Sequence, residues 1–297
     1  METQTALETL AWPALPGPRE IRLNRDTGLL KLIACACMMC DHMGKMVYPF
    51  AYRLSAAGPW AFLLPTINVL RAVGRLAMPM FAYGIAVGCL KTRSVWKYIL
   101  RLLLMGILVQ PLYQEAMGHV PLNSFHWADS FWRLDLIYDY YYSSNLNIFF
   151  TLSLGALLIG CFRNRRFVFT VLAALLAWTL RGRIDYGYRG VVLICLFYLF
   201  IDRPLASFAA VFLYMVNWAM PNLFSSFKTT STSQLYALLA LPLIYLPLRR
   251  RRVILPKWFY YGFYPAHLTI IYLLMSVDRT FWADAACTIA DALKAAF

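Results

Sequence analysis

Charged residues are scarce in this sequence of 297 residues. Only 14% of the residues are Asp, Glu, Lys or Arg, whereas 61% are hydrophobic, and the mean hydropathy is positive. A soluble domain of this size needs more polar surface. The composition therefore excludes an ordinary soluble protein and predicts an integral membrane protein.

The sequence also lacks paired Cys-x-x-Cys motifs with zinc-site spacing, and we expect no cleavable signal peptide in its first residues. Six of its seven cysteines lie in apolar runs, so we expect them to pack in the membrane and to form neither disulfides nor a metal site. The first 25 residues carry charges and three prolines but no apolar core. The first apolar run is long enough to remain as a helix.

Acidic residues are half as numerous as basic ones, 14 against 28, which gives a formal charge of +14. In a soluble chain this excess could indicate nucleic acid as a partner. Here the basic residues lie in short connections between apolar runs, which is typical of cytoplasmic loops of membrane proteins. We therefore expect the lipid bilayer as a partner, no nucleic acid, and a multi-pass location in a bacterial cytoplasmic (inner) membrane.

The apolar runs predict an all-α fold, a polytopic bundle of about nine transmembrane helices. The expected spans are 28–50, 69–90, 95–112, 146–162, 167–180, 189–201, 204–219, 234–248 and 257–276. Residues 59–68 and 280–297 could form interfacial helices. The chain then divides into a cytoplasmic segment at 1–27, a transmembrane domain at 28–276 with a long external loop at 113–145, and an amphipathic tail at 277–297.

Basic residues mark every second connection of this bundle, which places those connections in the cytoplasm. They are Arg19, Arg22 and Arg25, then Lys91, Arg93 and Lys97, then Arg163, Arg165 and Arg166, then Arg203, and finally the tetra-arginine run at 249–252. The segment "RGRIDYGYRG" at 181–190 is an exception, because its arginines fall on the outer side.

Ionisable residues inside the predicted spans are costly in hydrocarbon and are therefore paired, wet or functional. Asp41 and His42 interrupt the first span, Arg71 and Arg75 the second, and His267 the last. At a rise of about 1.5 Å per residue, His42, Arg75 and His267 reach a similar depth. Because Asp41 and His42 point about 100° apart on one helix, we expect Asp41 to pair with Arg75, not with His42.

Each of these residues also has a structural interpretation. Asp41 could form an ordinary ion pair with Lys45 one turn away. His42 could bond a carbonyl across helices, and His267 could bond carbonyls freed by Pro265. Between the like charges of the second span, a phosphate, a carboxylate or a developing oxyanion is an alternative to Asp41.

Five segments resemble the TraX family, typified by the enzyme that acetylates the N-terminus of conjugative F-type pilin. They are "LLKLIACACMMCDHMG", "VLRAVGRLAMPMFAYGI", "NIFFTLSLG", "DYGYRGVVLI" and "KWFYYGFYPAHLTIIY", in the family's order between about residue 24 and residue 275. The family in turn is similar to the membrane acyltransferases of type three. In those proteins a basic residue precedes a histidine by eleven positions, as Lys31 precedes His42.

This resemblance implies a membrane acetyltransferase that carries acetyl from cytoplasmic acetyl-CoA through a tunnel to an acceptor at the outer side. The acceptor is an amine or hydroxyl on an unknown protein or glycan, such as a pilin-like N-terminus. His42 would be the base, Arg75 would stabilise the oxyanion, Asp41 would orient Arg75, and His267 would be a second polar donor. The expected CoA residues are Lys31, Arg93, Lys97 and Arg163, and the expected acceptor residues are Arg71, Asn147, Thr151, Asp185 and Tyr188.

Two other functional classes fit parts of the sequence. A secondary transporter could use buried Asp, His and Arg as proton relay and substrate clamp. A transporter built from inverted repeats should contain a second interrupted segment like the first, and the sequence has none. A structural role in pilus assembly explains the intramembrane polar residues least well, so the sequence favours the enzyme.

Overall fold

The computed structural model describes residues 27–56, 63–117, 133–142, 145–220, 233–246 and 256–276. These residues form α2 (Thr27–Ala56), α3 (Leu63–Gly74), α4 (Ala77–Lys91), α5 (Val95–Ala116), α7 (Leu134–Ile137), η1 (Tyr138–Tyr142), α8 (Ile148–Arg163), α9 (Phe167–Thr179), α10 (Gly187–Leu199), α11 (Pro204–Ala219), η2 (Ser233–Leu239), α12 (Ala240–Tyr245) and α13 (Lys257–Ser276). They contain no strand, only an isolated bridge between Leu146 and Ile184. The all-α prediction is therefore confirmed for this part of the chain.

Each predicted span coincides with one or two of these helices. The last span has the bounds of α13, whereas α2 begins one residue before the first span and ends six residues beyond it. The second span contains a break, so that it comprises α3 and α4, and the eighth consists of η2 and α12. Residues 63–68 are the first turns of α3 and not a separate interfacial helix.

Two helical stretches of the described chain are long and apolar enough to cross a membrane. They are Leu64–Lys91, formed by α3 and α4, and Val95–Ala116, which is α5. The helices α8 to α11 are apolar but have only 13 to 16 residues. That is about 20 to 24 Å of helix, shorter than the hydrocarbon layer of about 30 Å. The number of nine crossings therefore stays a prediction.

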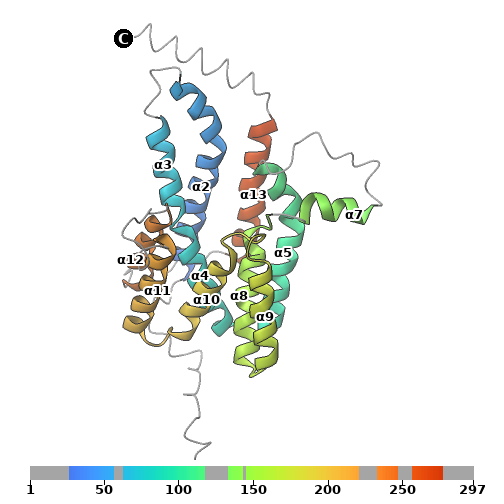
Figure 1. Ribbon diagram of the computed structural model, residues 1–297, viewed down its shortest axis with the longest axis vertical. Coiled ribbons are helices and arrows are strands. Elements are labelled where there is room, and N and C mark those ends of the chain that lie inside the picture. Colours follow the sequence, from blue (N-terminus) through green and yellow to red (C-terminus); the bar gives the residue numbers. More distant parts are fainter. Residues whose placement is uncertain are drawn as a thin grey trace, which may run out of the picture.

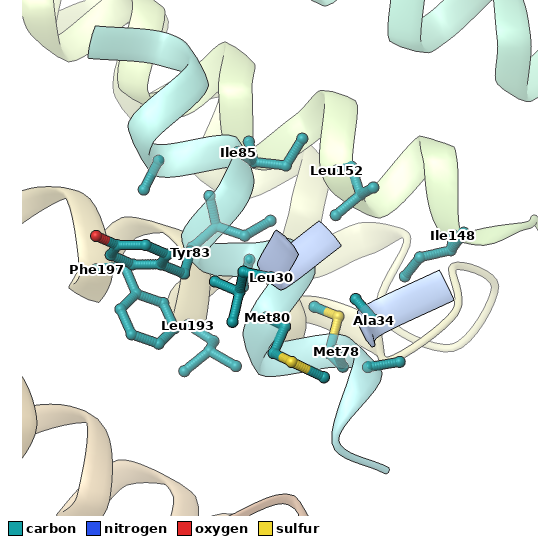
Figure 2. Packing of buried hydrophobic residues seen from close by; sticks show 14 of the residues in the cluster. Leu30, Ala34, Met78, Met80, Tyr83, Ile85, Ile148, Leu152, Leu193 and Phe197 are labelled. Carbon is teal, nitrogen blue, oxygen red and sulfur yellow. The ribbon is translucent and has the colours of Figure 1, made fainter. Parts of the chain in front are cut away.

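The helix α4 lies inside the bundle and packs against α2, α8, α10 and α12 (Figure 1). Twelve of its fifteen residues are buried. Figure 2 shows Tyr83 and Ile85 of α4 among side chains of the neighbouring helices. A small residue also lets Tyr98 of α5 approach α4 closely, because a Cβ added at Gly88 would lie 2.8 Å from the Tyr98 hydroxyl oxygen.

Two prolines explain local features of the helices. The ring of a proline clashes with the carbonyl four residues earlier, and for Pro79 that carbonyl belongs to Arg75, where the turn at 75–76 separates α3 from α4. Pro111 lies inside α5 and cannot bond the carbonyl of Ile107. The Tyr142 hydroxyl donates to that carbonyl at 2.8 Å, so Tyr142 fixes η1 against α5.

The basic connections after α4, α8 and α10 lie at the same end of the bundle, the lower end in Figure 1. Two contacts join the first pair: Arg163 Nη1 donates to the Cys89 carbonyl at 2.8 Å, and the Arg166 guanidinium lies 5.6 Å from the centre of the Trp96 ring. The tetra-arginine run, the segment before residue 27, most of the predicted external loop and the predicted tail lie outside the described residues.

Cysteine labelling can test which end of the bundle faces the cytoplasm. Arg165 and Gly182 are both exposed and lie at opposite ends of α9. If basic connections stay inside, a membrane-impermeant maleimide should label Gly182→Cys in intact cells and Arg165→Cys only after the cells are opened. The unsubstituted protein controls for its seven native cysteines. Labelling of Arg165→Cys in intact cells would contradict the predicted orientation.

Candidate functional site

A cavity of about 190 Å³ lies where α2, the α3–α4 break, α5, α13 and the loop before α10 meet. Five predicted site residues line it: Asp41, His42, Arg71, Arg75 and Asp185. The remaining lining residues are Met38, Lys45, Gly74, Ala77, Met78, Phe81, Tyr113, Met117, Ile148, Tyr186 and Tyr264. The cavity therefore combines two carboxylates, three cations and an imidazole. In the described residues, no three His, Cys, Asp or Glu side chains are grouped as a metal site.

Two histidines form a hydrogen-bonded pair at this cavity. His42 Nδ1 lies 2.7 Å from His267 Nε2, and the two rings are stacked with centroids 5.0 Å apart. His267 Nδ1 lies 2.9 Å from the Phe263 carbonyl oxygen. A carbonyl only accepts, so Nδ1 of His267 carries the hydrogen, and Nε2 of the neutral ring accepts from His42 Nδ1. This assignment leaves His42 Nε2 with a free lone pair.

The position of His267 differs from the expected role of a second polar donor. Its side chain is buried, with only 2% exposed, and it does not line the cavity. Its one N–H is bound to the Phe263 carbonyl, and toward His42 it is an acceptor. His267 therefore positions His42.

Asp41 and Arg75 form an ion pair across α2 and the α3–α4 break. The distance from Arg75 Nη2 to Asp41 Oδ1 is 2.9 Å, and both side chains are less than one-fifth exposed. Arg75 Nε is buried and has no hydrogen-bond partner in the described part of the chain. A buried donor without an acceptor is unfavourable by about 1–3 kcal/mol, so this N–H is poised for an oxygen of a ligand.

Gly74 allows α2 and α3 to approach closely enough for this ion pair. A Cβ at position 74 would lie 2.2 Å from Asp41 Cβ and 2.7 Å from Asp41 Cα. These distances are far shorter than any van der Waals contact, and one of them is to the backbone. Only glycine fits here without separating the two helices.

Asp185 reaches the cavity because its loop is fixed by hydrogen bonds. The Thr151 hydroxyl donates to the Asp185 carbonyl oxygen, and the backbone N–H of Asp185 donates to the Leu146 carbonyl at 3.0 Å. The left-handed backbone at Tyr186 and Gly187 then turns the chain into α10. Thr151, expected at the acceptor entrance, is fully buried and absent from the cavity lining. Its contact is with the loop.

Two further residues expected at the acceptor site lie elsewhere. Asn147 is fully buried and caps α8, accepting from the Phe149 N–H at 3.0 Å. Its amide also donates to the Gly106 carbonyl at 2.8 Å and to Gln110 Oε1 at 2.9 Å. Tyr188 packs against the Trp178 ring with centroids 5.1 Å apart. Neither residue lines the cavity.

The four residues expected to bind CoA also lie away from the cavity lining. Lys31 places its ammonium 5.7 Å from the centre of the Tyr260 ring. Arg93 and Lys97 are exposed around the start of α5, and Arg163 is bound to the end of α4. Along α4, the fourteen steps from Ala77 to Lys91 correspond to about 21 Å. Arg93, Lys97 and Arg163 therefore mark a second region at the basic end, whereas the Lys31 side chain lies beside Gly84, midway along α4.

The sequence prediction missed several residues of the cavity wall. Lys45 was considered only as a partner of Asp41, and Tyr264 was not considered at all. The Tyr264 ring meets His42 edge to face with centroids 6.4 Å apart. Its spacing of three residues from His267 places both side chains on one face of α13, so this signal was present in the sequence. Gly74, Tyr113 and Tyr186 gave no comparable signal.

The sequence of this chain is similar to one known protein family. The family described as "TraX protein" matches residues 26–275. The chain belongs to the TraX family. Every residue that lines the cavity lies within the TraX match.

A curated relative gives a further, more distant similarity to this TraX-family chain. The probable fimbrial assembly protein FimC, serogroup H1, of Dichelobacter nodosus is 29% identical over 128 residues. The match covers 43% of this chain and 43% of that protein, less than half the length of the relative. No solved structure matches the chain.

Proposed function

We propose that this TraX-family protein is a multi-pass acetyltransferase of the bacterial inner membrane. It transfers acetyl from cytoplasmic acetyl-CoA to an amine or hydroxyl of an acceptor at the outer side. The observation that carries the proposal is the His42–His267 hydrogen bond of 2.7 Å at the wall of a polar cavity. The name of the fimbrial relative supports a pilin-like N-terminus as one such acceptor.

His42 supplies the base. A neutral imidazole with a free lone pair can accept a proton from an attacking amine or hydroxyl. Its Nδ1–H is held by His267, so Nε2 takes the proton of the acceptor as the acceptor nitrogen or oxygen attacks the thioester carbonyl. The new bond to the acetyl carbon forms, the carbon–sulfur bond breaks, and the imidazolium returns its proton to the leaving CoA thiolate.

Arg75 supplies the electrostatic stabilisation. The thioester oxygen gains negative charge as the acceptor attacks, and a fixed donor in a site of low dielectric stabilises that charge. Arg75 meets this requirement because Asp41 holds its Nη2 while the buried Nε–H has no partner in the described chain. Arg71 and Asp185, which also line the cavity, are then left to contact the acceptor.

Exposed apolar surface supports the membrane location. Among the thirteen residues of α9 only Ala173 and Ala177 are buried. Eight large apolar side chains on this helix are exposed: Phe167, Val168, Phe169, Val171, Leu172, Leu175, Leu176 and Trp178. A water-exposed surface of this kind is unfavourable, and lipid is the solvent that suits it. Arg93, Lys97 and Arg163 at the basic end of the bundle, with Lys31 further along α4, would bind the CoA phosphates.

Acetyl-CoA turnover tests the proposal directly. The purified protein in detergent should bind acetyl-CoA and release CoA thiol when an amine or hydroxyl acceptor is added. Mass spectrometry of envelope proteins and glycans should show an acetyl mark that is lost when the gene is deleted. A protein that binds no acetyl-CoA would favour the secondary transporter instead.

His267 should affect the rate without contacting the reactants. His267→Phe removes the acceptor that fixes His42 Nδ1–H, so we expect it to lose much of the factor of about 10²–10⁴ that a positioned base supplies. His267→Gln retains an acceptor oxygen and should recover part of that loss. The measurement is kcat, with acetyl-CoA affinity as the control. Equal rates for the two variants would contradict a positioning role.

A further inference from the structure

A second cavity, of about 160 Å³, lies between α8, α9 and α10. Its wall includes Leu158 and Phe162 of α8, Thr170 of α9, and Cys195 and Tyr198 of α10. The Thr170 hydroxyl donates to the Arg166 carbonyl at 3.1 Å, so the surface that remains is almost wholly apolar. None of these residues lines the cavity that contains His42, so the two sites are separate.

Four arginines lie within four residues of residues that line this cavity, at its basic end. Phe162 is followed directly by the turn that carries Arg163, Arg165 and Arg166. Arg203 directly precedes α11 and lies four residues after Leu199, which lines the cavity. All four are exposed. Arg163 and Arg166 have contacts with Cys89 and Trp96, whereas the guanidinium groups of Arg165 and Arg203 make no hydrogen bond or ion pair with the described residues.

The charge around this end is strongly positive. Between residues 158 and 203 the sequence contains two acidic residues, Asp202 beside Arg203 and Asp185 at the far end of α10. At the basic end, the single carboxylate of Asp202 is therefore outnumbered by four guanidinium groups. Arginine binds phosphate oxygens with two parallel hydrogen bonds, and an apolar cavity of this size excludes water and takes up an apolar guest.

We propose that this cavity binds an acyl chain of an anionic phospholipid, whose phosphate is bound by Arg165 and Arg203. Basic pockets between membrane helices on the cytoplasmic side commonly bind anionic head groups. The inference rests on the membrane location and orientation proposed above and is independent of acetyl transfer. The acyl chain covers the gap between α8, α9 and α10, and the head group joins the turn after α8 to the start of α11.

Native mass spectrometry of the full-length protein in detergent tests this site, with phosphatidylglycerol and phosphatidylcholine as the two probes. The unsubstituted protein should retain phosphatidylglycerol more strongly. Loss of charged hydrogen bonds in the double variant Arg165→Gln, Arg203→Gln should weaken phosphatidylglycerol binding at least about tenfold. Cys195→Trp fills the cavity and should weaken both lipids. CoA release should be unchanged in the double variant.

Matched controls separate this site from general contact with lipid. Arg183→Gln changes an exposed arginine at the other end of α9, and Leu175→Trp enlarges an exposed residue on α9. Both should bind phosphatidylglycerol like the unsubstituted protein. The proposal is wrong if that protein binds the two lipids equally, if a control variant loses as much binding as the double variant, or if acetyl-CoA displaces the lipid. If Cys195→Trp fails to fold, the exposed arginine variants still decide the question.

Discussion

Replacing His42 with alanine is expected to reduce acetyl transfer by about a hundredfold or more, the usual range for loss of a positioned base. The cavity would keep Asp41, Arg75 and Asp185, and the cations at the basic end are about a helix length away. Acetyl-CoA binding should therefore remain.

One purified His42→Ala preparation can distinguish catalysis from structural support. His42 acts as the base if the variant melts close to the temperature of the unsubstituted protein and still binds acetyl-CoA, but no longer transfers acetyl. If His42 served only as a hydrogen-bonding link between α2 and α13, the variant would lose stability instead. A stable variant that still turns over would remove His42 from the mechanism.

Gly74→Ala is expected to damage stability and activity together. Its methyl group would occupy space 2.2 Å from Asp41 Cβ and 2.7 Å from the Asp41 backbone, so α2 and α3 must move apart. Overpacking of this kind typically reduces stability by about 1–3 kcal/mol, and the displaced Asp41 would release Arg75. Thermal unfolding and CoA release measure the two effects.

Gly262 provides the matched control for this substitution. It also lies within a helix, α13, but a Cβ there would meet nothing within 4 Å. Gly262→Ala should therefore unfold at or above the temperature of the unsubstituted protein and retain activity. Equal behaviour of the two alanine variants would show that α2 and α3 are not packed as closely as the structure indicates.

The helices could be predicted because long apolar runs leave few alternatives, whereas the site could be predicted only in part. A constant rise per residue was sufficient to bring His42, Arg75 and His267 to one depth, and the structure places them at or beside one cavity. Polar residues near helix ends were harder to interpret. From the sequence, Asn147 and Thr151 were both plausible acceptor residues. In the structure their side chains instead donate hydrogen bonds to backbone carbonyls.

Backbone geometry also decides which residues of one polar segment reach the cavity, and residue types alone do not reveal this. Asp185 and Tyr188 stand three residues apart in one polar segment, but only Asp185 lines the cavity. The left-handed turn at Tyr186 and Gly187 lies between them and redirects the chain. Pro79, by contrast, was a usable sequence signal for the break after Arg75, because a proline disturbs the carbonyl four residues before it.

The break between α3 and α4 makes substitutions at Gly74, Arg75 and Pro79 depend on one another. Pro79 ends the regular helix at Arg75, Gly74 admits Asp41 beside that point, and Arg75 occupies the place that results. A change at Pro79 or Gly74 would therefore displace Arg75 from Asp41. We therefore expect natural selection to act on them as a unit, so that lineages which replace Pro79 are soon free to replace Gly74 and Arg75 as well.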